Sequence, residues 1–416
     1  MPTLSSSNRS QLSVKLEGVY PEHFGVPQPG NGAALAMTSE SLDYSVKTET
    51  SKSLRADRAV ADVIAVSAGA QGGFGFELAF KEYDVFLQGV LQQDFEYWGQ
   101  DGVSDLLGPL SLTASTITAS VAPVGASAFT QLERGQWFGL RPVEGSPQAV
   151  LVYFASRSFR VSRVMLPTET VLTLDEATPL DLSRASEALQ NAVMSSARVS
   201  NGSTMKSYTL EVAHTDIEVY RQFTGMIAAK LNLKLSVGAI VTGSVEFIGK
   251  GFKLAGASDM GQLVPSTGYS PANATRGVFD VFENHTPIAA STYIKSADLT
   301  IDNSLRAQDA VGVFGNAGVA SGTFNVTASL ELYFADRMLY EKFLNQEASS
   351  LSIPILDGAG NGYVFEMPRI KYTAAKVNAG GLDQDNLLKV ELRALPELRP
   401  RSLHYGRTLV LYRIGV

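Results

Sequence analysis

Apolar and polar residues alternate with a period of two in several parts of the chain. The alternation is clear at residues 74–80 and 231–237, and similar segments occur at 324–334 and 387–395. A period of two places the apolar residues on one face of an extended strand. The pattern therefore predicts a mainly β protein.

Apolar residues spaced by three and four follow two of these strands. They predict amphipathic helices over residues 81–98 and 335–348. A third helix is expected over 182–198, where Asp181 or Ser183 could cap the first turn.

The chain also resembles itself in sequence. Residues 39–44 (SESLDY) match 296–301 (SADLTI), and 76–80 (FELAF) match 330–334 (LELYF). Any two strand–helix segments share some likeness, but a Glu-Leu pair at the same place before a helix favours a true repeat. The sequence therefore predicts a duplicated β-unit with one flanking helix in each copy.

These patterns divide the chain into five segments. Residues 1–38 are polar and rich in Pro and Gly but carry spaced apolar residues, so we expect this segment to extend and dock on another surface. Residues 111–175 hold short Thr/Val-rich runs that have no counterpart in the second copy, so we expect this segment to be an insertion. The expected segments are an extended N-terminal arm (1–38), a first unit (39–110 and 176–255), an inserted outer β-domain (111–175), a linker (256–292) and a second unit (293–416).

Composition narrows the function. The 416 residues include 34 Lys and Arg against 41 Asp and Glu. This net charge of −7 argues against a conventional duplex-DNA-binding protein, because such a protein needs a basic face to neutralise phosphates. The charged fraction of 18% is below the typical ~25%, which indicates a surface covered by partners. Cysteine is absent, which excludes disulfides and thiolate zinc sites and fits a reducing cytoplasm. The sequence contains neither an apolar run of spanning length nor an N-terminal apolar signal region, so we expect no membrane insertion and no secretion.

Candidate chemistry is sparse. The glycine-rich segment 69–75 leads into a strand rather than a helix, so we expect a turn or bulge and not a phosphate cradle. Paired aspartates at 57 and 62 and at 383 and 385 lack a third group for acid–base work. The histidines do not follow metal-ligand spacing: His23, His214, His285 and His404. We therefore predict a protein that is not an enzyme and has no catalytic, cofactor-binding or metal-binding residues.

Several segments resemble one family. The arm SQLSVKLEGVYPEHFGVPQPG with MTSESLDYS behind it, and the block at 61–89, are similar to the start and first core block of the tail tube (major tail) proteins of long non-contractile-tailed bacteriophages. The block at 195–251, with Phe223-Thr-Gly225 and the run at 243–247, resembles the second core block of that family. The segment 117–176 is similar to a small barrel that some members carry outside the tube.

The resemblance implies a fold and a function. The implied fold is a duplicated β-sandwich or barrel unit, each with a flanking α-helix, plus a small inserted β-barrel domain. Members self-assemble into stacked rings whose inner strands join into one barrel, the conduit for DNA ejection into the host. Simple members form rings of six units, so two units per chain imply a homotrimer with pseudo-sixfold symmetry.

The resemblance also implies partners and a place. The partners would be further copies of the chain and the tape measure, terminator and tip proteins, with transient contact to passing DNA and without cofactors. The protein would be part of the virion, made in the host bacterial cytoplasm.

Candidate site residues follow from this picture. A neutral-to-acidic lumen would let DNA slide without sticking. The candidate lumen-facing residues are the acids on polar sides of strands, although they could equally face the exterior or the ring interfaces: Glu77, Glu331, Glu211, Glu246 and Glu391. The candidate inter-subunit contacts lie on the two helices: Tyr83, Phe86, Leu87, Leu339 and Phe343.

An alternative function is a secreted or virion-surface carbohydrate-binding β-module. Two β-rich repeats with aromatic residues would suit sugar stacking. The missing signal and the presence of only two Trp residues count against it.

Overall fold

The computed structural model describes residues 5–18, 31–98, 103–106, 110–112, 115–125, 128–142, 160–174, 192–275, 277, 281–400 and 402–415. Strands dominate the described residues, and the two α-helices among them are short. The predicted mainly β class is confirmed.

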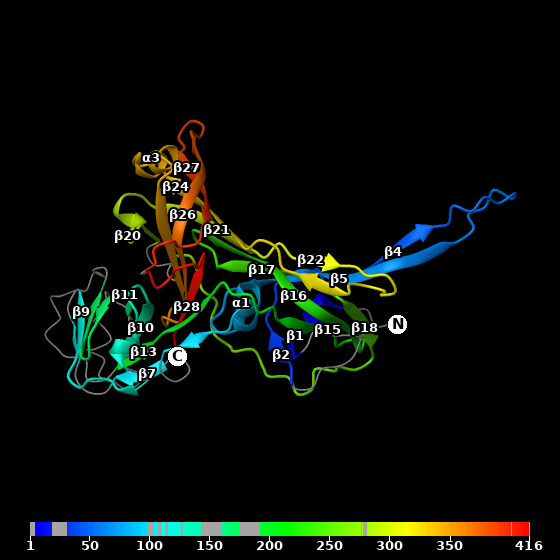
Figure 1. Cartoon of the computed structure of the whole chain (residues 1–416), viewed down its shortest axis with the longest axis horizontal. Coiled ribbons are helices and arrows are strands. Elements are labelled where there is room, and N and C mark those ends of the chain that lie inside the picture. Colours follow the sequence, from blue (N-terminus) through cyan, green and yellow to red (C-terminus); the bar gives the residue numbers. More distant parts are fainter. Residues whose placement is uncertain are drawn as a thin grey trace.

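The central feature is an antiparallel sheet of eight strands (Figure 1). Only the second halves of its two longest strands, β16 and β26, belong to it. The short β3 (Ser39–Glu40) also pairs with β5. The order is β4 (Asp43–Thr50), β5 (Val63–Glu77), β17 (Thr242–Gly249), β16 (Val219–Ser236), β21 (Ile294–Asp302), β24 (Asn325–Tyr333), β27 (Leu387–Ala394) and β26 (Gly362–Asn378).

The first halves of β16 and β26 enter other layers. The first half of β16 lies between β15 (Ser207–His214) and β18 (Gly251–Ala255), and that of β26 lies between β25 (Ala348–Leu356) and β28 (Val410–Ile414). Further short strands extend these layers or form a separate hairpin: β1 (Ser10–Glu17), β2 (Ala33–Leu35), β6 (Glu96–Tyr97), β14 (Ala197–Ser200), β19 (Phe282–Glu283), β20 (Thr286–Pro287), β22 (Arg306–Gln308) and β23 (Gly318–Ala320). The described 3₁₀-helices are η1 (Ser7–Arg9), η3 (Phe129–Gln131) and η5 (Ile288–Ala290).

The duplication is present strand for strand. The chain of pairings β4–β5–β17–β16–β15 recurs as β21–β24–β27–β26–β25. Both long strands carry two register breaks, and these fall at matching places: Phe223 and Ala228 in β16 correspond to Met367 and Tyr372 in β26, 144 residues later in each case. A β-bulge fixes the local register, so two shared breaks make the correspondence unambiguous.

The registers correct one detail of the predicted repeat. Ser39 pairs with Gly75, whereas its counterpart Ser296 pairs with Glu331. Glu331 therefore corresponds to Gly75 and not to Glu77, so the sequence match was displaced by two residues along this strand. The hydrophobic pattern does not reveal this displacement, because a shift of two residues keeps every side chain on the same face of the strand.

The helices occupy equivalent places but are shorter than predicted. α1 (Asp84–Leu91) packs on β16 and α3 (Met338–Leu344) packs on β26. A glutamine in the left-handed region follows each helix, Gln92 with φ 54° and Gln346 with φ 53°. Such a residue terminates a helix because its amide bonds back to the last turn.

The third predicted helix is wrong over its last part. Residues 192–195 form a strand, β13 (Ala192–Ser195), and 197–200 form β14. Residues 182–191 lie outside the described residues. Sheet pairing with β10 (Trp137–Pro142) and β28 decides the conformation of this segment over its local helical pattern.

The N-terminal segment is not simply an extended arm. β1 pairs along its whole length with β15 and also with β2, so it belongs to a sheet of its own chain. Leu12 and Val14 are buried in the main core. Residues 1–4 and 19–30 lie outside the described part.

A second sheet of seven strands lies at the opposite end of the molecule from the β4–β5 hairpin (Figure 1). It has its own apolar core, which includes Ile117, Phe138 and Leu172. Its strands reach beyond residues 111–175 on both sides. The order is β7 (Val103–Leu106), β13, β10 (Trp137–Pro142), β11 (Arg160–Pro167), β12 (Val171–Leu174), β9 (Thr116–Ala119) and β8 (Leu110–Leu112).

The glycine-rich segment 69–75 lies inside β5 rather than in a turn. A Cβ on Gly73 would lie 2.0 Å from the carbonyl oxygen of Val245, and one on Gly72 would lie 2.1 Å from that of Ser41. The glycines therefore let the strands on both sides of β5 come close to it.

Candidate functional site

The eight-stranded sheet has one apolar and one polar face. On the strands within the body of the molecule, buried residues alternate with residues that point away from the core, and the pairing registers place the outward residues, with their counterparts on β4, on a common face. We call this the polar face. Its acids and bases are balanced: Asp43, Glu77, Glu246, Asp298, Asp302, Glu331 and Glu391, with Lys47, Lys230, Lys234, Lys371, Lys376, Lys389 and Arg393.

Unlike charges are neighbours around the internal pairing of β16 with β17 and β21, whereas between β26 and β27 Lys376 is opposite Lys389. Lys230 is opposite Glu246 on one side and Asp302 on the other, and Lys234 is opposite Asp298. The Lys389 Nζ lies 3.7 Å from the Glu391 Oε1. Because acids and bases are balanced over its strands, the polar face is neutral rather than acidic.

The two outer strands of the eight-stranded sheet are free edges. Among the residues that the structure describes, β4 pairs only with β5, and β26 from Tyr372 to Asn378 pairs only with β27. An unpaired edge presents a row of N–H and C=O groups that can accept another strand.

Inside the chain, the edges that correspond to these two free edges are paired with each other. β16, the outer strand of the first copy in this sheet, pairs with β21, the outer strand of the second, from Lys230 opposite Asp302 to Ser236 opposite Ser296. We call this the internal joint. Its two strands are the counterparts of β26 and β4.

Comparison with known proteins gives a family match over most of the chain. The sequence model of one family, described as phage tail tube protein, matches residues 7–394. The chain belongs to the phage tail tube protein family. No curated protein matches it. This tail tube protein is therefore a structural component of a bacteriophage tail, and within the described residues no helix could span a membrane.

Four of the five predicted lumen residues share the polar face: Glu77, Glu246, Glu331 and Glu391. Glu211 does not. It is only 1% exposed and accepts hydrogen bonds from Gln222 (2.7 Å) and Ser258 (2.6 Å), so it is a buried structural group.

Among these four acids one pair is equivalent in the two copies of the tail tube unit. Glu246 pairs with Lys230, and Glu391 pairs with Ala374, which lies 144 residues after Lys230. Glu77 and Glu331 are not equivalent, because the counterpart of Glu331 is Gly75. The duplicated carboxylate on the polar face is thus the Glu246 and Glu391 pair.

The predicted helix contacts are mostly wrong. Tyr83, Phe86, Leu87 and Leu339 are buried in the core of their own chain, and Phe343 is half-buried. A helical apolar stripe predicts burial but does not say against which chain. Leu344, which lies in the last turn of α3, is instead 61% exposed.

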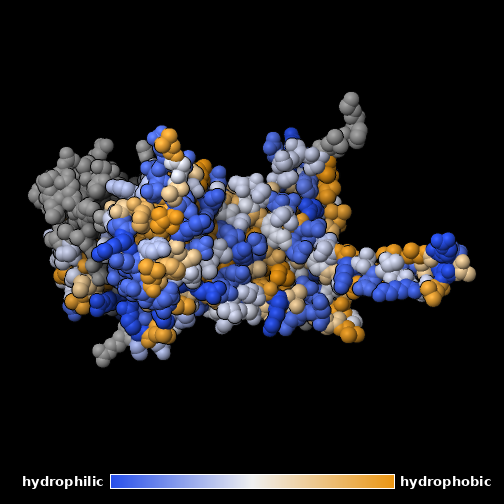
Figure 2. Space-filling view, turned by 90° about the horizontal axis from the view of Figure 1, so that it is seen from above, coloured by the Kyte–Doolittle hydropathy of each residue, from blue (hydrophilic) through white to orange (hydrophobic). Residues whose placement is uncertain are grey.

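The β4–β5 hairpin stands clear of the body (Figure 2). Its apolar side chains are exposed, both near its base at Val46 and Val66 and at its tip at Leu54 and Val60. A run of exposed apolar residues on a projecting hairpin marks an interaction surface.

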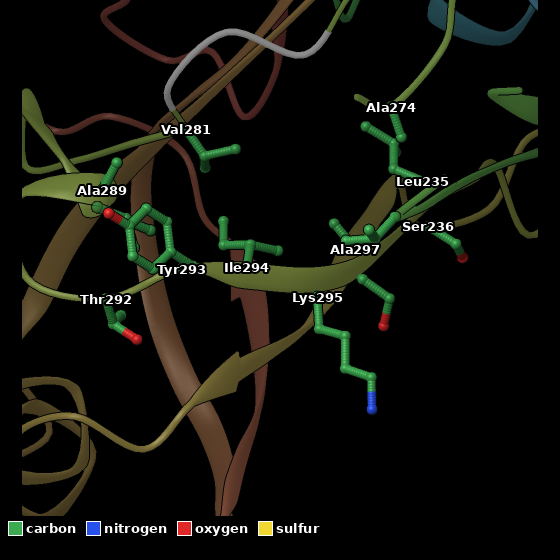
Figure 3. A pocket seen from close by; sticks show the side chains of 13 residues that line it. Leu235, Ser236, Ala274, Val281, Ala289, Thr292, Tyr293, Ile294, Lys295 and Ala297 are labelled. Atoms are coloured by element: carbon green, nitrogen blue, oxygen red, sulfur yellow. The ribbon is translucent and has the colours of Figure 1, made fainter. Parts of the chain in front are cut away.

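A pocket of about 150 Å³ lies where β16 and β21 meet (Figure 3). In Figure 3, Leu235, Val281 and Ile294 lie on one side of the β21 ribbon and Lys295 extends on the other. Acids and histidines are missing from its described lining, whose ionisable side chains are Tyr293 and Lys295. Among the described residues there is also no group of three or more acids and histidines that could hold a metal ion.

One buried charge cluster joins the seven-stranded sheet to the second copy. Glu366 on β26 accepts a hydrogen bond from the Trp137 indole at 2.7 Å, and its Oε1 lies 3.6 Å from Arg163 and 3.5 Å from His404. Burial raises the pKa of the Glu366 carboxyl, but His404 and Arg163 more than offset this and bring the pKa to about 2. The carboxylate is a structural anchor between the two sheets.

Proposed function

We propose that three copies of this chain close into a ring by pairing β26 of each with β4 of the next. The rings stack into the tail tube, and the polar face lines the channel through which DNA passes. Two units per chain then supply the six units of each ring.

The internal joint carries this proposal. In the internal joint, the outer strand of one unit already pairs with the outer strand of the other unit. The same two edges are left free at the outer ends of the sheet. A heterologous contact that repeats through a closing rotation forms a ring and removes every edge.

The internal joint also gives the register. Positions on β26 follow their counterparts on β16 by 144 residues, and positions on β4 precede their counterparts on β21 by 257. The internal pair of Asn232 and Thr300 therefore becomes Lys376 opposite Asp43 of the neighbour. These two exposed side chains carry opposite charges. Opposite charges directly across a pair of strands stabilise it by roughly 0.2–1 kcal/mol.

The neutral polar face suits a channel for DNA. A basic wall would bind phosphates by releasing counterions, and the transport of DNA would then depend strongly on salt. On the polar face each of Lys230, Lys234 and Lys389 has an acid as a cross-strand neighbour.

A charge swap tests the ring joint. We expect Lys376→Asp to weaken assembly because two aspartates then face each other, and Asp43→Lys to weaken it because two lysines do. The double variant should recover rings and tubes, measured by electron microscopy and sedimentation velocity.

The control is Glu169→Lys, an exposed charge change in the turn between β11 and β12, which should assemble like the unaltered protein. All variants should keep the melting temperature of the monomer, because both joint residues are exposed. Single variants that assemble normally, or a folded double variant that does not assemble, would refute this register.

A further inference from the structure

We propose that the base of the β4–β5 hairpin packs on the last turn of α3 in the neighbouring chain, with Val46 against Leu344. This inference rests on the ring closure proposed above. It names the second surface that each joint brings together.

Inside the chain, the last turn of α1 corresponds to the last turn of α3, and it is already covered. The connection between β21 and β24 lies over the last turn of α1. The Asn303 Nδ2 donates a hydrogen bond to the Val90 carbonyl oxygen at 2.8 Å, and the Gln92 Nε2 donates one to the Ser321 Oγ at 2.8 Å. Asn303 is buried in this contact. The internal joint therefore has two parts, a strand pair and a cap on the helix.

The registers identify the counterpart of this cap. Asn303 lies seven residues after Ser296, and Val46 lies seven residues after the equivalent Ser39. By the same reasoning Ser321 corresponds to Ala65, next to Val66. Whichever chain pairs its β4 with β26 must bring Val46 to the last turn of α3.

On α3, the surface that corresponds to the covered surface of α1 is exposed in the single chain. α1 and α3 end in the same hydrogen-bonded motif, from Gln92 to Gly89 and from Gln346 to Phe343. By this motif Leu344 is the counterpart of Val90. Val90 is buried, whereas Leu344 is 61% exposed in the single chain.

The two surfaces are chemically complementary. At the internal joint the cap is polar, because Asn303 and Ser321 form hydrogen bonds. At the free ends both sides are apolar instead: Val46 is 47% exposed and Val66 is 45% exposed, and they would meet Leu344. Exposed apolar residues at matched positions on both sides favour a contact between two copies, because the contact removes apolar surface from water. The occupant of the α3 surface is therefore the hairpin of a second copy.

Cross-linking tests this contact directly, because the chain has no cysteine of its own. We would mix two single variants, Val46→Cys and Leu344→Cys, let them assemble and add a short bis-maleimide. The expected product is a covalent dimer on a denaturing gel. Either variant alone should give no dimer, and neither should Val46→Cys mixed with Leu398→Cys, whose position is as exposed as Leu344.

A parallel mixture separates this inference from the ring joint. Lys376→Cys mixed with Asp43→Cys reports the strand pair alone. Dimers from both mixtures support both proposals. A dimer from the strand pair without one from Val46 and Leu344 would overturn the helix contact and leave the ring standing. Absence of both dimers would overturn ring closure and this contact together.

A polar substitution gives a second measurement. Leu344→Asp should reduce the assembled fraction about tenfold or more while the monomer melts normally, because the side chain is exposed before assembly. Leu398→Asp is the matched control, since Leu398 has the same 61% exposure outside the proposed contact. Normal tubes from Leu344→Asp would contradict the proposal.

Discussion

Glu366 shows how one residue fastens two sheets. Its carboxylate is fully buried, and its partners come from the seven-stranded sheet and from the C-terminal segment. A buried charge is tolerated only when partners compensate for the lost water. Removing its charge leaves Arg163 and His404 beside a neutral group in the interior.

We expect Glu366→Gln to destabilise the folded chain in a pH-dependent way. The folded pKa of about 2 is below the ordinary value of 4.5, so ionised Glu366 stabilises the fold above about pH 4.5. That contribution, about 3 kcal/mol at full strength, is lost as the pH falls from about 4.5 towards 2. Urea unfolding from pH 6 to pH 2.5 should show the difference between the unaltered chain and the variant shrinking over that window.

Glu391→Gln is the control, because this exposed carboxylate should change the unfolding free energy by no more than about 0.5 kcal/mol. A gap between Glu366→Gln and the unaltered chain that stays constant down to pH 2.5 would contradict the assignment.

At the scale of elements, the two copies differ in one hairpin of the eight-stranded sheet. In the first copy β4 and β5 continue beyond the sheet as a free arm (Figure 1). In the second copy the equivalent connection folds back onto the first copy, where the Asn316 Nδ2 donates to the Gly249 carbonyl oxygen at 2.7 Å. A ring of three chains would therefore project three arms rather than six.

We expect the tip of this hairpin to join successive rings. Replacing residues 52–61 by Asn-Gly, a short type I′ turn, removes the exposed Leu54 and Val60 but leaves the base of the hairpin. Rings should still close, and electron microscopy should find single rings in place of tubes.

Shortening the 120–125 loop of the seven-stranded sheet is the matched control and should leave tubes intact. Tubes of ordinary length from the hairpin variant would show that the tip has no part in stacking.

At the scale of the whole molecule, the duplicated acid should govern how DNA meets the wall. If the polar face lines the channel, Glu246 and Glu391 of three chains form one band of six carboxylates. The double variant Glu246→Lys, Glu391→Lys should assemble, because both side chains are exposed. Its tubes should retain labelled DNA at low salt and release it at high salt, since each added cation creates a site for counterion release.

Glu169→Lys with Asp385→Lys makes the same change of net charge in turns outside the strands of the polar face and should not retain DNA. Equal retention by both variants would show that Glu246 and Glu391 do not face the channel.

The sequence by itself determined the class of the fold, the strands of the repeat and the two helices after them. These depend on periodicity, which is local: alternation at 74–80 and helical spacing after it are sufficient to specify the elements. The order of the blocks also pointed to the correct family, because each block keeps its own pattern of turns and strands.

Only the tertiary structure decided register, partners and burial. A shift of two residues between 76–80 and 330–334 leaves the hydrophobic pattern unchanged, so only the pairing of Ser296 with Glu331 reveals it. Glu211 and Tyr83 have the sequence pattern of surface and interface residues, yet neighbouring layers bury both. The segment at 192–198 has a helical pattern but pairs as strands. In each case a contact between distant parts of the chain sets the outcome, and such contacts leave no local signal in a single sequence.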